Sequence, residues 1–184
     1  RSTVTLFQAC VTSTLLYAAE TWYCVPEKFM DTIEARYRTL LYTMLGIPVS
    51  SKYQSVLYEL DLMTAKHTIM SRRLKYFNKI MRDDGNCLTR DMIIEEYKVA
   101  SNANKHLTFM GSVKKACSTY NLPDLTTSNH VPDEMISETI RETCTRECWI
   151  EMVKSPISIP RMWIRNRETA YHSMPWSESN AILR

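Results

Sequence analysis

The stretch TAKHTIMSRRLKYFNKIMR, from Thr64 to Arg82, predicts a long amphipathic helix. At about 100° per residue, the apolar positions fall on one face, which we expect to be buried: Met63, Met70, Leu74, Phe77 and Met81. Four basic positions fall on another face: Arg72, Lys75, Lys79 and Arg82. With Lys66 and Arg73, the stretch holds six basic residues and no acid, whereas the whole chain of 184 residues has a net charge of only +3.

The composition of the chain is that of a globular, mostly helical protein. Apolar residues make up 45% of the sequence and charged residues 23%, which excludes most disordered and fibrous classes. Only three glycines are present, so glycine-rich phosphate loops and arrays of tight hairpins are nearly excluded. The longest apolar stretch, residues 9–19, is well short of the roughly 20 residues that span a bilayer, so we expect no membrane segment.

Helical periodicity and its end signals predict an all-α bundle of about six to seven helices with an irregular C-terminal arm. The expected helices cover residues 4–19, 26–45, 52–60, 64–84, 91–100, 107–120 and 133–154. Gly46 and Pro48 end the second helix, and Thr64 and Thr89 are the expected caps of the fourth and fifth. Pro123 and Pro132 mark residues 121–132 as a linker. This divides the chain into residues 1–84, additional helices in 85–120, the linker, and an acidic helix with a tail in 133–184.

The second helix is expected to bury one face and to expose the other. Its apolar stripe consists of Phe29, Ile33, Tyr37, Leu40, Leu41 and Met44. Glu34, Arg36 and Arg38 fall off that stripe and are expected on the solvated side. Arg36 and Arg38 are therefore two further basic residues expected at the surface.

No catalytic constellation can be recognised, so we expect neither an enzyme nor a cofactor in this chain. None of the cysteines and histidines lies in the local context of an activated nucleophile. Cys144 and Cys148 lie on one helix face, and Cys117 and His130 could complete a zinc site, but the set lacks the close CxxC pair that structural zinc sites favour. We therefore expect Cys144 and Cys148 to be small core residues and predict no metal.

The six cysteines and the chain start also suggest where the protein works. A chain of this size can fold without disulfide bonds, and the sequence shows no secretory leader. Both observations favour free thiols in a reducing, intracellular compartment. Nucleus, mitochondrion and cytoplasm remain open. Because the chain begins at Arg1 rather than Met, we expect a piece of a longer polypeptide or a processed form.

The basic face of the fourth helix has two interpretations. Fixed lysines and arginines along a rigid helix suit the phosphates of a nucleic-acid backbone. Alternatively, the face is solvated. Its charges then pair with the carboxylates of Glu95 and Glu96 or with those of the acidic helix 133–151.

Residues from Leu6 to about Arg82 resemble the segment that follows the catalytic palm in reverse transcriptases of non-LTR (LINE-type) retrotransposons. The first matching block is LLYAAETW at 15–22, preceded by Leu6-Phe7 and Cys10-Val11. The second is IEARYRTLL at 33–41 with MLGI at 44–47, and the third joins residues 53–62 to RRLKY at 72–76. The match departs from the family at Ala18 and Ala19, where Gly and Ser are usual, and at Leu41, where Arg is common.

The resemblance implies a thumb-like helical region that contacts the backbone of RNA or of an RNA–DNA duplex. The metal-binding aspartates of the family lie upstream of this segment, so the resemblance implies no polymerase activity for this chain. We expect a non-catalytic nucleic-acid-binding domain, or a derivative reused as an RNA-bound subunit of a ribonucleoprotein with other protein subunits. The alternative is a helical protein–protein interaction scaffold without nucleic-acid binding. The expected contacts are Lys66, Arg72, Arg73, Lys75, Lys79, Arg82, Arg36 and Arg38.

Overall fold

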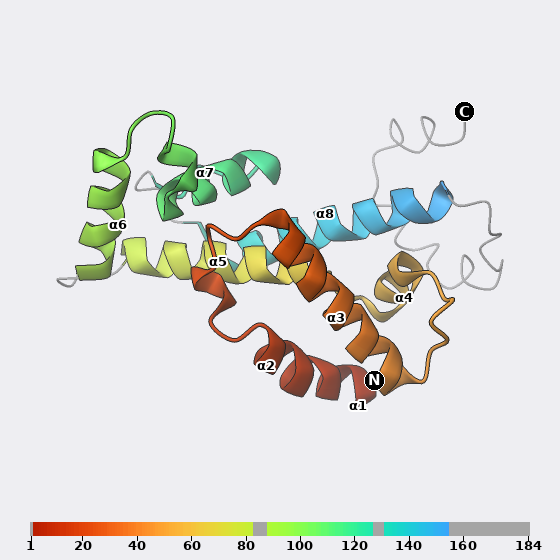
Figure 1. Ribbon diagram of the computed structural model, residues 1–184. Coiled ribbons are helices and arrows are strands. Elements are labelled where there is room, and N and C mark those ends of the chain that lie inside the picture. Colours follow the sequence, from red (N-terminus) through yellow and green to blue (C-terminus); the bar gives the residue numbers. More distant parts are fainter. Residues whose placement is uncertain (1, 83–87, 127–130, 155–184) are drawn as a thin grey trace. The chain divides into compact units, whose positions relative to one another are not determined.

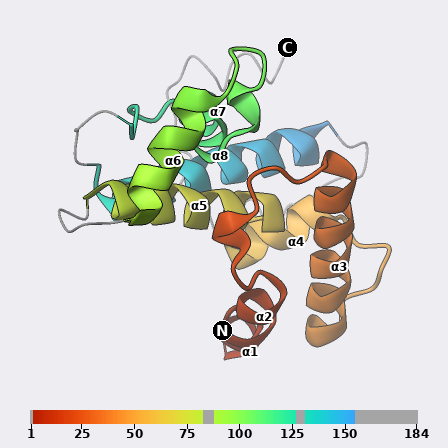
Figure 2. The same cartoon turned by 60° about the vertical axis from the view of Figure 1, so that its left-hand side comes forward.

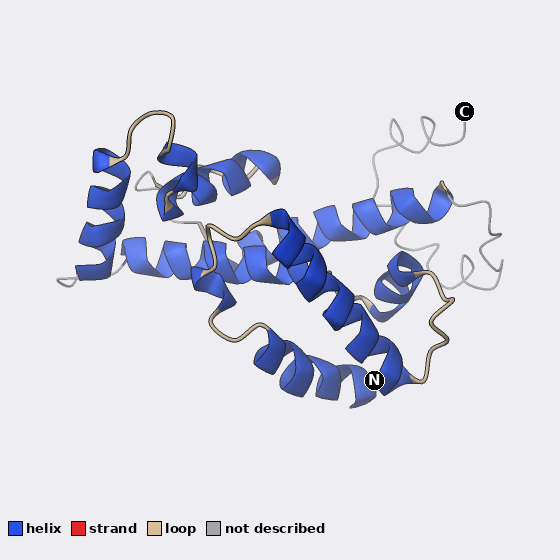
Figure 3. Ribbon diagram, in the orientation of Figure 1, coloured by secondary structure: helices blue, strands red, loops and turns tan. Residues whose placement is uncertain are grey.

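The computed structural model describes residues 2–82, 88–126 and 131–154, and these residues form helices and connecting loops with no strand (Figures 1 and 3). The expectation of an all-α fold is confirmed. The chain divides into two compact units, Arg1–Trp149 and Ile150–Arg184. The packing described below is that of the first unit, and the predicted C-terminal arm lies outside the described residues.

The helices follow one another in short steps along the chain. Their bounds are α1 Ser2–Leu6, η1 Phe7–Thr12, α2 Ser13–Leu15, η2 Ala19–Thr21, α3 Glu27–Leu45, α4 Tyr53–Leu60, α5 Ala65–Arg82, α6 Leu88–Val99, η3 Lys105–Leu107, α7 Phe109–Thr119 and α8 Asp133–Val153. The segments η2 and η3 are 3₁₀ turns, and η1 is a π-helical stretch that joins α1 to α2 without a break.

The first helix ends earlier than its predicted end at Ala19. The helical segment stops at Leu15, and Ala18 adopts a left-handed backbone with φ of 52° before the short η2 turn. The carbonyl oxygen of Leu16 accepts a hydrogen bond from Nη1 of Arg72 at 2.9 Å. The same carbonyl accepts from the Ala19 amide at 3.3 Å, so Arg72 is a second, long-range donor at the point where the helix stops.

Several helix ends follow the predicted signals. Gly46, with φ of 62°, ends α3, and the amide of Ile47 returns to the carbonyl of Tyr42 at 3.0 Å. The hydroxyl of Thr64 accepts a hydrogen bond from the His67 amide at 3.1 Å, as expected of a cap for α5. Thr89 is not a cap, because α6 already begins at Leu88.

Helix α3 buries a different face from the one predicted. Tyr37 and Leu41 are buried as expected, but Phe29, Leu40 and Met44 keep 46%, 38% and 37% of their surface exposed. The buried face is rotated toward Glu34, whose carboxylate accepts hydrogen bonds from the amides of Ala65 (3.2 Å) and Lys66 (3.1 Å) at the start of α5. The expectation that Glu34 lies on a solvated face is therefore wrong: the first turn of α5 has unpaired amides that require an acceptor.

Helix α5 passes through both apolar clusters of the first unit (Figures 1 and 2). The first cluster gathers α1 to α4 around the start of α5 and includes Phe7, Leu16, Tyr37, Leu41, Leu57 and Ile69. The second gathers α6, α7 and α8 around the end of α5 and includes Leu74, Phe77, Phe109, Val113, Ile136 and Ile140. Because α5 is contacted from several sides, it buries Ile69 and Ile80 in addition to the predicted Leu74 and Phe77.

Helix α8 lies antiparallel to α5. Asp133, at the start of α8, accepts a hydrogen bond from Nδ2 of Asn78 at 2.7 Å, near the end of α5. Glu147, about four turns further on, lies 3.4 Å from Nε2 of His67 in the first turns of α5. Both apolar clusters are thereby closed by the same helix.

The segment predicted as a linker contributes to the core where it is described. Leu122, Leu125 and Val131 are buried in the second cluster. The Val131 carbonyl also accepts a hydrogen bond from Nδ2 of Asn78 at 2.8 Å. Of the helices in the described part of the chain, none has the length and apolar character to cross a membrane.

A glycine inside α7 is required by close packing, and its replacement tests that packing. A Cβ atom at Gly111 would lie 1.8 Å from the carbonyl oxygen of Lys105 in η3. We expect Gly111→Ala to lower the free energy of unfolding by about 3 kcal/mol or more, because backbone atoms must move to relieve the overlap.

The matched control is Gly46→Ala, where no atom lies within 4 Å of the added methyl and only the left-handed backbone is unfavourable. We expect that change to cost about 1 kcal/mol. Urea unfolding of the two variants measures the difference. An equal or smaller loss at Gly111 would contradict the described contact.

Candidate nucleic-acid interface

The three arginines of α5 bind backbone carbonyl groups within the protein. Arg72 donates to Leu16, Arg73 donates through Nη2 to the carbonyl of Trp22, and Arg82 donates through Nη2 to that of Val131. Arg82 also lies 3.8 Å from the carboxylate of Asp133. Each guanidinium therefore holds a different connecting segment against α5.

Arg73 is the most deeply placed of the three. It keeps only 6% of its surface exposed, and burial lowers the pKa of its guanidinium from the ordinary value. Its Nε atom has no hydrogen-bond partner among the described residues. Arg73 therefore offers little surface to a nucleic-acid phosphate, and its guanidinium is bonded within the protein.

The two arginines of α3 differ in their surroundings. The guanidinium of Arg38 stacks over Tyr42 (5.3 Å) and Tyr53 (5.8 Å), and its Nη2 lies 3.4 Å from the carbonyl of Val49. Arg36 is exposed. Since residues two apart on a helix lie on nearly opposite sides, Arg36 points away from the α5 contact that Glu34 makes.

Three lysines of α5 remain available to a ligand. Lys66 and Lys79 are exposed and Lys75 is half-buried, and none of the three pairs with a carboxylate in the described parts of the chain. Lys75 and Lys79 lie one turn apart on the same side of α5, whereas Lys66 lies nine residues before Lys75 and therefore on the opposite side. The fold gathers only Lys75 and Lys79 from the predicted basic face.

Acidic residues of α8 weaken the positive field near Lys75. Lys75 lines a pocket of about 370 Å³ together with Arg141 and three carboxylates, those of Asp133, Glu134 and Glu138. Arg82, which does not line this pocket, lies 3.8 Å from the carboxylate of Asp133. Of the four basic positions predicted on this face, Arg82 is the one that forms an ion pair with the acidic helix among the described residues.

A buried group that sequence reasoning missed lies between α5 and α8. His67 accepts or donates a 2.7 Å hydrogen bond between its Nδ1 and the Thr64 hydroxyl, and its ring meets Tyr120 edge-on at 5.9 Å. Cys144 and Cys148 are buried beside it, with 1% and 4% of their surface exposed. The four-residue spacing of the cysteines was visible in the sequence, but the partner on α5 depends on the antiparallel packing.

The environment of this group shifts its pKa values in opposite directions. Hydrogen bonds from Cys148 and from His67 outweigh burial and lower the pKa of Cys144 to about 5. Burial lowers the pKa of His67, but its hydrogen bond to Cys144 and the charges of Cys144 and Glu147 outweigh burial and raise it. These shifts favour a thiolate on Cys144 and a proton on His67, and both side chains are buried between α5 and α8.

The zinc set considered from the sequence is not assembled. Cys117 belongs to the second apolar cluster, whereas Cys144 and Cys148 belong to the first, and His130 lies outside the described residues. Over residues 2–82, 88–126 and 131–154, no group of three or more His, Cys, Asp and Glu side chains is placed to hold a metal ion.

The structural role of Arg73 predicts an unequal effect of two charge-removing changes on α5. Arg73→Gln should lower the free energy of unfolding by about 2 kcal/mol, because the part-buried Trp22 carbonyl loses a charged donor. Lys79→Gln, at an exposed position of the same helix, should change it by less than about 0.5 kcal/mol. Thermal or urea unfolding compares the stability of the two variants. Equal losses would show that the hydrogen bond between Arg73 and the Trp22 carbonyl does not stabilise the fold.

The shifted pKa of Cys144 predicts a spectroscopic signature. Thiolate absorbance near 240 nm should persist at neutral pH and decrease as the pH falls through about 5, the pKa of Cys144. Cys144→Ser should abolish this step, and His67→Gln should move it to higher pH by removing a hydrogen bond that favours the thiolate. Cys10→Ser, which changes an exposed cysteine, is the control and should leave the step in place. A step that survives Cys144→Ser would refute the assignment.

A comparison of the chain with protein-family models, with curated proteins and with solved structures found no match. The likeness to the post-palm segment of LINE-type reverse transcriptases therefore stands on the residues of the three blocks alone.

Proposed function

We propose that this chain is a non-catalytic helical domain that binds the backbone of RNA or of an RNA–DNA duplex. The observation that carries the proposal is the pair Lys75 and Lys79, which lie one turn apart on an acid-free helix and pair with no carboxylate among the described residues. The likeness of residues 6–82 to a post-palm reverse transcriptase segment supports the same function.

The arrangement of the internal arginines supports binding by a rigid surface. Arg72 and Arg82 bond to carbonyls of segments far away in the sequence, which fixes α5 relative to its neighbours. Lysines on a fixed helix lose little further freedom when they meet phosphates, and point charges on flexible stems suit backbone contact without base recognition. The binding should therefore tolerate sequence changes in the nucleic acid.

The test is the salt dependence of binding by Lys75→Gln/Lys79→Gln. Fluorescence anisotropy with a structured RNA and with an RNA–DNA hybrid, over a series of KCl concentrations, gives the slope of log affinity against log salt. Loss of two phosphate contacts should reduce the steepness of that slope by about 1.5 to 2. Arg72 and Arg82 are left unchanged because their loss would disturb the fold itself.

The matched control is Lys28→Gln/Lys115→Gln, which removes the same charge from exposed positions on α3 and α7. That variant should keep the slope of the original protein. Equal slopes for all three proteins would exclude the α5 lysines as the binding site, and absence of binding at low salt would exclude the function.

Helix α6 favours a second candidate, a helical protein–protein interaction scaffold. Leu88, Met92 and Val99 keep 73%, 63% and 77% of their surface exposed. Their spacing of four and seven residues places them on one face of a single helix. Such a stripe is typical of a docking surface for another protein, and failure of nucleic-acid binding in the test above would favour this candidate.

A further inference from the structure

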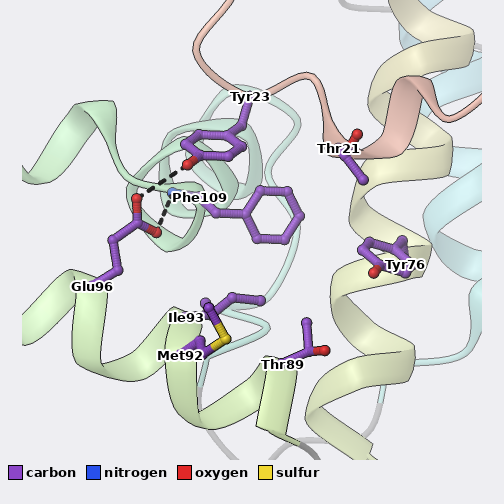
Figure 4. A pocket seen from close by; sticks show the side chains of 8 residues that line it. All are labelled: Thr21, Tyr23, Tyr76, Thr89, Met92, Ile93, Glu96 and Phe109. Atoms are coloured by element: carbon purple, nitrogen blue, oxygen red, sulfur yellow. Dashed lines mark hydrogen bonds between the residues drawn. The ribbon is translucent and has the colours of Figure 1, made fainter.

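A pocket of about 400 Å³ lies between η2, α5, α6 and α7 (Figure 4). Its lining residues come from four segments that are far apart in the sequence: Thr21, Tyr23, Tyr76, Thr89, Met92, Ile93, Glu96 and Phe109. Figure 4 shows Tyr23 and Phe109 on the opposite side of the hollow from Met92 and Ile93, with Glu96 and Tyr76 toward its two ends. The volume suits a small organic group.

Three aromatic rings form much of the wall. Phe109 meets Tyr23 at 5.2 Å with an interplanar angle of 71°, and it meets Tyr76 at 6.3 Å with an angle of 69°. Phe109 keeps only 4% of its surface exposed, whereas Tyr23 and Tyr76 are half-buried, so the two tyrosines supply most of the aromatic surface that a ligand can contact. Aromatic faces carry negative electrostatic potential, and a group of them attracts a cation that has been stripped of water.

A carboxylate is held at the edge of these rings. Oε1 of Glu96 accepts a hydrogen bond from the Tyr23 hydroxyl at 3.2 Å, and Oε2 accepts one from the Phe109 amide at 3.4 Å. Burial and the neighbouring Glu96 both raise the pKa of Tyr23, so its phenol remains a neutral donor. Glu96 is thus oriented by two neutral groups, and no lysine or arginine of the described residues forms an ion pair with it.

No described side chain supplies the cation that this arrangement suits. The basic residues that stack on rings in the described ranges do so on Tyr42, Tyr53 and Tyr97, which are not part of the pocket. A neutral apolar ligand would cover the Glu96 carboxylate without compensating its charge, which is unfavourable. A phosphate would be repelled by it, so the pocket is separate from the proposed nucleic-acid surface.

We propose that this pocket binds an organic ammonium group whose nitrogen is methylated. A primary ammonium requires acceptors for three N–H groups, whereas a trimethylammonium has none to satisfy and presents methyl groups to the rings and to Met92. Glu96 neutralises the charge from one side. The same group occurs on choline-type molecules and on methylated lysine side chains, and both are ligands of this chemical class.

The experiment uses the full chain with ¹³C-labelled methionine methyl groups and follows the NMR signal of Met92. This signal is assigned as the one that is lost in Met92→Leu. Choline and its neutral carbon isostere, 3,3-dimethylbutan-1-ol, are titrated at an ionic strength held constant with NaCl. Choline should shift the signal saturably and bind at least about fivefold more tightly than the isostere, as expected for a cation over several rings. A saturable shift is also expected for acetylated trimethyl-lysine amide. Tighter binding of this compound than of choline would indicate a methylated lysine side chain as the natural ligand, and tighter binding of choline would indicate a small molecule.

Glu96→Gln tests the carboxylate, because the amide oxygen can still accept from one of the two donors, Tyr23 or Phe109, while the charge is lost. Choline binding should weaken by about threefold or more, and binding of the isostere should stay the same. Glu95→Gln is the matched control on the same helix and should change neither. The proposal would be overturned by any of three results: equal binding of choline and the isostere, an unaltered choline affinity in Glu96→Gln, or the absence of a saturable shift. Thermal unfolding confirms that the variants are folded.

Discussion

The carboxylate of Glu34 is the contact on which the arrangement of this protein depends. It accepts the first amides of α5, those of Ala65 and Lys66, and also a 2.5 Å hydrogen bond from the hydroxyl of Tyr53 in α4. A negative charge at the N-terminus of a helix satisfies unpaired donors and opposes the positive end of the helix dipole. One side chain of α3 thus sets where α5 begins and joins three helices, and α5 in turn passes through both apolar clusters.

The charge of α5 has two different uses. Its arginines provide the planar, multiple donors that backbone carbonyls require, and they hold residues 16, 22 and 131 against the helix. Its lysines, of which two are exposed and Lys75 is half-buried, form no ion pair with a carboxylate among the described residues. A run of basic residues in a sequence cannot distinguish these roles, because the carbonyl partners lie about 50 residues away in either direction.

Signals from a few neighbouring residues predicted most helix ends. Which side chains are buried, in contrast, depends on the other helices that pack against them. Gly46 and Thr64 marked the end of α3 and the start of α5 because left-handed and capping conformations are properties of a few neighbouring residues. The face of α3 was mispredicted because Phe29 and Leu40 are apolar yet meet little of the core, while Glu34 is charged yet meets α5. The His67–Cys144 pair and the aromatic pocket with Glu96 could not be predicted, since each joins helices whose packing has no local signal.

The hydrogen bonds of the α5 arginines also bear on the order in which the protein folds during synthesis. The partners of Arg72 and Arg73 precede α5 in the chain, so they have already emerged when α5 leaves the ribosome, whereas the partner of Arg82 follows 49 residues later. Helix α8 emerges last of the described helices, and it contributes Cys144 and Cys148 to the first cluster and Ile136 and Ile140 to the second. Until α8 arrives, both clusters expose apolar surface to water, and a nascent chain paused before residue 133 is the form most exposed to chaperones and to aggregation.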